Sequence, residues 1–78
     1  MQKIKLLWDF NGVDSLKIAQ HFNIHLEEFL EKEDVQFHNI GLEPINDYHN
    51  IAYLVIEKQY VDKIKHVLKP KRAFLLDD

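Results

Sequence analysis

Two histidines stand four residues apart in the stretch HFNIH, at positions 21 and 25, and Glu28 follows three residues later. Side chains at this spacing share one face of a helix. Two imidazoles placed in this way can chelate zinc, nickel or copper, and Glu28 could add a carboxylate. However, Phe22 stands where HExxH metalloproteases carry their glutamate, and the same spacing is common at the edge of an amphipathic helix. A weak metal site at His21, His25 and Glu28 and a plain helix surface both remain open.

A second group of reactive residues includes His49 and Asp9. Histidine titrates near neutral pH, and a neighbouring carboxylate can orient its ring, so this pair could act as a general base. His21 is a further candidate for the catalytic histidine. Turns also select Asp, Asn and His for local backbone bonding, and this structural explanation stays open beside the catalytic one.

Several aromatic residues could line an apolar pocket with polar tips. The candidate pocket residues are Trp8, Phe10, Asn11, Phe37 and Tyr53, with Tyr48 nearby in the sequence. The alternative is that the aromatic residues fill a core and an interface, because a small domain needs the large area that they bury.

Composition narrows the classes of function. The chain has 78 residues, a net charge of −3 and no cysteine, which predicts one domain over residues 1–78 and argues against nucleic-acid binding. Thiolate metal sites and cysteine nucleophiles are excluded, and no cofactor is predicted. The sequence shows no signal peptide and no apolar run of about 20 residues, so we expect a cytoplasmic protein without membrane association.

Hydrophobic periodicity predicts six elements. The 3–10 segment alternates Ile4, Leu6, Trp8 and Phe10 against Lys5, Leu7 and Asp9, which is typical of a strand. The predicted strands are 3–10, 35–42, 50–57 and 72–76, the predicted helices are 15–32 and 59–68, and residues 43–47 are predicted to form a turn around Pro44. Asp14 or Ser15 could cap the first helix.

Each predicted helix carries an apolar stripe. The buried positions expected in the helices are Ile18, Ala19, Phe22, Leu26, Phe29, Leu30, Tyr60, Val61, Ile64, Val67 and Leu68. The basic segment 63–72 is explained by the end of the second helix, where cations favour the helix dipole.

The order β-α-β-β-α-β resembles the ferredoxin-like α/β plait over nearly the whole chain. The resemblance implies an α+β fold with a four-stranded antiparallel sheet, spatial order 4-1-3-2, and both helices on one face. It also implies that the end of the first strand and the start of the third share one rim, so Asp9, Asn11, Asp14 and His49 are expected to lie near one another.

Two helices cover only one face of such a sheet. The other face is predicted to be apolar, because residues 51–56 are apolar on both sides of the strand and Leu7 and Phe74 add to it. Sheet-to-sheet pairing of two copies would cover it. In this respect the chain is similar to the dimeric α/β-barrel group, whose small plaits pair through their sheets.

Two functions follow, and the sequence leaves open whether the protein is an enzyme. The first is a non-catalytic homodimeric module that binds a small molecule or a protein. The second is a cofactor-independent enzyme of the dimeric-barrel kind, in which His49 or His21 would transfer protons, Asp9 would orient the ring, and Trp8 and Tyr53 would shape an apolar substrate pocket. Binding of a divalent metal by the histidines is a third.

Overall fold

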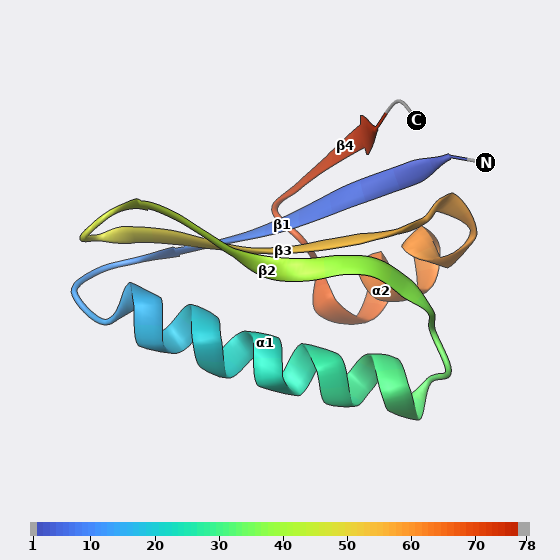
Figure 1. Ribbon diagram of the computed structural model, residues 1–78, viewed down its shortest axis with the longest axis horizontal. Coiled ribbons are helices and arrows are strands. Elements are labelled where there is room, and N and C mark those ends of the chain that lie inside the picture. The colour runs from blue at the N-terminus through green and yellow to red at the C-terminus, as the bar shows by residue number, and fades with distance from the viewer. Residues whose placement is uncertain (1, 77–78) are drawn as a thin grey trace.

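The computed structural model of the chain describes residues 2–76. Its elements are β1 (Lys3–Asn11), α1 (Ser15–Lys32), β2 (Phe37–Asn46), β3 (His49–Glu57), the 3₁₀ turn η1 (Lys58–Tyr60), α2 (Val61–Leu68) and β4 (Arg72–Leu76). In this part of the chain the strands form one antiparallel sheet in the order β2-β3-β1-β4, and both helices lie against the same face (Figure 1). The predicted ferredoxin-like plait is confirmed.

The hydrophobic core lies between the sheet and the helices. Alternate residues of β1 and β3 face the helices, including Leu6, Trp8, Leu54 and Ile56, which are 0–5% exposed. They pack against apolar residues of α1 and α2, among them Leu26, Leu30 and Ile64. Burying one such side chain contributes about 1.5–3 kcal/mol, so this layer supplies the main stabilisation of the fold.

The two helices bury fewer apolar side chains than their apolar stripes predict. Ile18 and Val67 were expected inside, but their side chains are 48% and 52% exposed. α2 has only eight residues and lies away from the first turn of α1 in Figure 1, so no neighbouring element covers Ile18. Ile64 is the buried residue of α2. The periodicity located both helices correctly but overestimated the width of their buried faces.

The predicted turn at residues 43–47 is wrong. Residues 43–46 belong to β2, and the chain reverses only at Asp47 and Tyr48. A proline lacks the N–H that a central strand needs, but β2 lies at the edge of the sheet, where Pro44 is tolerated. Its pairing with β3 also shifts register between Phe37 and Asn39 and between Pro44 and Asn46, which hides the alternation expected of a strand.

The first helix is fixed at its start by a buried pair, not by a side-chain cap. Asp14 occupies the N-cap position without a capping side-chain hydrogen bond. Ser15 is fully buried, and its hydroxyl oxygen accepts a hydrogen bond from the Asn50 amide at 2.8 Å. This contact joins the first residue of α1 to the start of β3.

The end of α2 is tied to the central strand. The indole N–H of Trp8 donates to the carbonyl of Leu68 at 2.9 Å. Carbonyls in the last turn of a helix have no partner within the helix, so Trp8 satisfies one of them from β1. Lys69 then adopts a left-handed conformation, with φ of 49°, before Pro70.

The two edges of the sheet differ. The β2 edge carries Pro44 and both register shifts, whereas β4 is a regular five-residue strand without proline. Phe74 and Leu75 of β4 are 49% and 57% exposed.

Neither helix within residues 2–76 combines the length and hydrophobicity that crossing a bilayer requires.

Candidate functional site on the open sheet face

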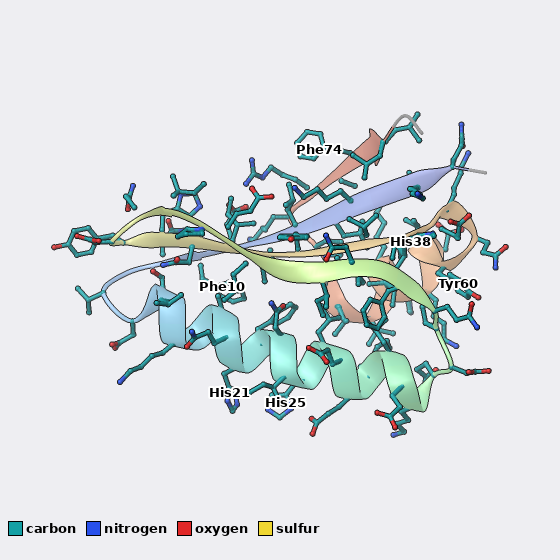
Figure 2. The ribbon with its side chains drawn as sticks, viewed as in Figure 1. Phe10, His21, His25, His38, Tyr60 and Phe74 are labelled. Carbon is teal, nitrogen blue, oxygen red and sulfur yellow. The ribbon has the colours of Figure 1, made fainter. Side chains whose placement is uncertain are left out.

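We call the sheet face opposite the helices the open face. On this face, polar side chains lie over apolar residues at the centre of the sheet. The register places Leu7, Ile51 and Val55 on this face, and they are 4–7% exposed. No helix covers them, so they owe their burial to longer neighbouring side chains. Phe74 of β4 also belongs to this face, because it pairs with Lys5, and it points away from the helices (Figure 2).

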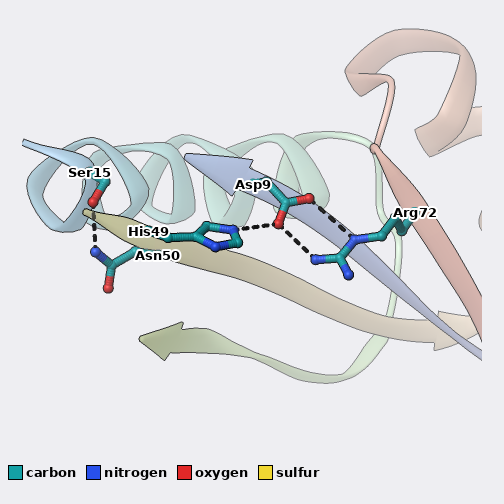
Figure 3. A network of polar contacts seen from close by, with 5 residues as sticks. All are labelled: Asp9, Ser15, His49, Asn50 and Arg72. Atoms are coloured by element: carbon teal, nitrogen blue, oxygen red, sulfur yellow. Dashed lines mark hydrogen bonds and ion pairs between the residues drawn. The ribbon is translucent and has the colours of Figure 1, made fainter. Parts of the chain in front are cut away.

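A three-residue polar cluster crosses the open face (Figure 3). Asp9 of β1 lies between His49 of β3 and Arg72 of β4. The His49 Nε2 atom is 2.8 Å from Asp9 Oδ1, and the Arg72 guanidinium donates to both carboxylate oxygens, at 2.7 Å to Oδ1 and 3.3 Å to Oδ2. A carboxylate on the inner strand is therefore held by side chains from both adjacent strands.

Sheet register explains this convergence. Asn11 pairs with His49 and Leu7 pairs with Arg72, so both partners lie diagonally across from Asp9 on the same face. Long side chains at diagonal positions are within contact distance. The backbone hydrogen bond from Lys71 to the carbonyl of Leu7, 2.9 Å long, fixes where β4 begins and so places Arg72.

The cluster keeps Asp9 ionised. Burial raises the pKa of Asp9, but hydrogen bonds from His49 and Arg72 and the charges of these residues outweigh it, so the pKa lies below the ordinary value of 3.8. The carboxylate is thus an acceptor at neutral pH, and it can orient the His49 ring with Nε2 as the donor. Such a pair can accept or donate a proton through the other ring nitrogen.

A second polar contact also lies on the open face. Lys5 forms an ion pair with Glu43, and its ammonium lies 4.6 Å from the centroid of the Tyr53 ring. Tyr53 in turn lies over Gly41 so closely that a Cβ on Gly41 would be 2.6 Å from the phenolic oxygen. β2 therefore needs a glycine here for the ring to lie flat on the sheet.

The other residues predicted near this site, and the third catalytic candidate His21, do not join the cluster. Asn11 pairs with His49 across the strands but is exposed, and Asp14 is exposed at the start of α1. His21 lies on α1, on the other side of the sheet from the cluster, where it contacts His25 (Figure 2).

The predicted pocket residues are divided between the two sides of the sheet. Trp8 and Phe10 face the helices, where their rings lie 4.9 Å and 5.4 Å from the ring of Phe22, whereas Tyr53 lies on the open face. Phe37 lines two adjoining hollows of about 590 and 400 Å³ at the start of β2. A third hollow of about 360 Å³ lies between the β1–α1 and β2–β3 connections. None of these three hollows is lined by Asp9, His49 or Arg72.

The histidine pair forms a contact of its own. The Nε2 atoms of His21 and His25 are 2.9 Å apart, and Glu28 Oε1 lies 3.0 Å from the Nδ1 atom of His25. Within residues 2–76, no group of three or more histidine and carboxylate side chains is placed to hold a metal ion. Glu28 thus contacts the far nitrogen of His25 and not the space between the rings.

Sequence reasoning overlooked Arg72. The residue ends a basic segment whose charges were explained by the helix dipole, and nothing local distinguishes it from Lys69 or Lys71. Its alternation with Phe74 and Leu76 is the one signal, because that pattern puts it on the same face as Phe74.

Comparison of the chain with known protein families, curated proteins and solved structures finds no match.

Proposed function

We propose that the chain is a non-catalytic homodimeric binding module whose two copies pair through their open faces. The observation that supports this most strongly is the lack of any helix over Leu7, Ile51 and Val55, which owe their burial to neighbouring side chains of the sheet. Phe74, 49% exposed on the same face, supplies apolar surface that a partner can contact directly. Exposed apolar surface on an uncovered sheet face is typical of an interaction site.

Charge favours a second copy as the partner. The open face carries both signs, with Lys5 and Arg72 among the carboxylates of Asp9, Glu43 and Glu57. A two-fold interface brings each patch against the same patch of the partner, so a surface of one sign would repel itself. This mixed surface can instead exchange ion pairs across the axis. The resemblance to the dimeric α/β-barrel group agrees with such pairing.

Mass in solution tests the proposal. Light scattering at micromolar concentrations should give twice the mass of one chain. Phe74→Lys should weaken association at least about tenfold, because an interface aromatic contributes more than 1 kcal/mol and a buried lysine opposes pairing. Ile24→Lys is the matched control, since Ile24 is 58% exposed on α1, the element on the other side of the sheet. A monomer mass across the concentration range would rule out the dimer.

The Asp9–His49 contact favours a second candidate, a cofactor-independent enzyme with His49 as general base. The pairing of a histidine with an ionised carboxylate at 2.8 Å supports it. A dimer could enclose the cluster between two sheets and supply a cavity there, which none of the three hollows described above provides. Hydrolysis of an activated ester such as p-nitrophenyl acetate should then fall at least about tenfold in His49→Gln but not in His66→Gln. Equal rates in the two variants would exclude this activity.

A further inference from the structure

The structure points to a two-nitrogen binding site for a divalent transition metal on α1, which we infer from the geometry of His21 and His25. Their Nε2 atoms lie 2.9 Å apart on neighbouring turns of one helix, on the side away from the open face (Figure 2). The inference is independent of dimer formation, because it uses no residue of the open face.

The number of protein ligands indicates the kind of ion. In the structure the two Nε2 atoms, 2.9 Å apart, share one proton in a hydrogen bond, and a bound ion would replace that proton. Structural Zn²⁺ sites are almost always completed by four protein ligands in tetrahedral geometry, whereas Cu²⁺ and Ni²⁺ take square-planar or tetragonal geometry with nitrogen and oxygen ligands. Two imidazole nitrogens with water in the remaining positions fit the second geometry. We therefore assign the site to Cu²⁺ or Ni²⁺.

Glu28 fixes the tautomer of His25, one of the two ligands. An ionised carboxylate only accepts hydrogen bonds, so its contact with His25 places a proton on Nδ1 of that ring. The neutral ring then has a bare Nε2, the atom that faces His21. Outer carboxylates of this type fix the tautomer of metal-bound histidines and make them more basic. His21 completes the site when its own proton moves to Nδ1.

The helix holds the pair in place while the rings stay accessible. Phe22, between the two histidines, packs against Trp8 and Phe10 and so fixes the rotation of α1 relative to the sheet. The His25 side chain is 62% exposed, and both rings can turn without displacing the core. Binding therefore needs only rotation of surface side chains.

Cu²⁺ titration followed by calorimetry and electron paramagnetic resonance tests the site. We expect one ion per chain with a two-nitrogen imidazole signature, and Ni²⁺ binding that competes with it. His21→Ala and His25→Ala should each weaken binding at least about tenfold, and Glu28→Gln by about 10-fold, the low end for an outer-shell partner. His66→Ala removes a histidine of α2 and serves as the control.

Two results would overturn the assignment. One is that His66→Ala weakens Cu²⁺ binding as much as His25→Ala does, which would mean that scattered surface groups hold the ion. The other is that Cu²⁺ leaves the melting temperature of the wild-type chain unchanged, because an ion held by the native helix must stabilise it. Circular dichroism of each variant establishes that the fold is intact.

Discussion

Asp9 is the residue on which the open-face cluster depends. It accepts hydrogen bonds from two strands at once, and its side chain is 19% exposed. Exposed ion pairs contribute little to stability, but an arginine that contacts both oxygens of a half-buried carboxylate has the better geometry. The contact therefore joins β3, β1 and β4 through side chains as well as through the backbone.

Asp9→Asn should lower the free energy of unfolding by about 1 kcal/mol at pH 7, since hydrogen bonds to a charged group contribute more than neutral ones. The pKa of Asp9 is lower in the folded chain than its ordinary 3.8, so its ionised form stabilises the fold above that value and this contribution is lost as the pH falls. The difference between wild type and variant should shrink as the pH falls from about 5 towards 2.

Urea denaturation at several pH values measures this difference. Glu27→Gln, on α1, removes a negative charge without touching the cluster and separates a local effect from a change in net charge. If the difference between wild type and Asp9→Asn stayed constant down to pH 2, the contact with His49 and Arg72 would not be the cause.

Among the elements, α2 depends on the sheet more than α1 does. It has eight residues and one buried side chain, Ile64, and isolated helices of this length are unstable in water. The hydrogen bond from Trp8 to Leu68 holds its last turn against β1. The core contacts of Ile64, Val61 and Leu68 hold α2 in place, together with this hydrogen bond and the ion pair between Lys63 and Glu33.

Trp8→Phe should destabilise the chain by about 1–3 kcal/mol, because it leaves the Leu68 carbonyl without its partner and also leaves space in the core. Hydrogen exchange should show the largest increase in the amides of α2. The matched control is Phe10→Leu, which also shortens an aromatic side chain of β1 but removes no hydrogen bond. Equal hydrogen exchange of the α2 amides in both variants would show that the lost side-chain volume, and not the hydrogen bond to Leu68, destabilises α2.

Strong periodicity made most elements predictable from the sequence. The alternation in β1 and the apolar run of β3 are unambiguous, and the bounds of α1 and β4 agree with prediction. β2 was harder to predict because its two register shifts interrupt the alternation and Pro44 is more common in turns. Exposure of Ile18 could not be predicted, because it depends on where the short α2 lies, which no local pattern encodes.

The candidate site was predictable only in part. Asp9 and His49 could be proposed from residue type and topology, because two adjacent strands bring them to one end of the sheet. Arg72 requires the register between β1 and β4, which depends on the whole fold. The contact between His21 and His25 follows from helical spacing alone, whereas the role of Glu28 depends on which nitrogen it meets.

For the whole molecule, the small size of the chain ties stability to association. A chain of 78 residues buries a smaller fraction of its surface than larger domains do, so a dimer interface would add a substantial part of its stability. Binding of a second copy to the folded chain shifts the unfolding equilibrium by mass action.

The melting temperature should therefore rise with protein concentration, by a few degrees over about a hundredfold range. Phe74→Lys should remove this dependence, whereas Ile24→Lys should keep it. Differential scanning calorimetry at several concentrations makes the measurement. A wild-type melting temperature that is independent of concentration would contradict pairing through the open face.

The unequal edges of the sheet limit how copies of this chain can stack edge to edge. Continuous stacking requires each copy to accept a strand at one edge and to offer a strand at the other. The regular β4 edge can do this, but Pro44 and the two register shifts interrupt the hydrogen-bonding groups of the β2 edge. If two copies paired through their β4 edges, each would then offer only its interrupted β2 edge. Strand addition would stop there and would not continue into an open-ended fibre.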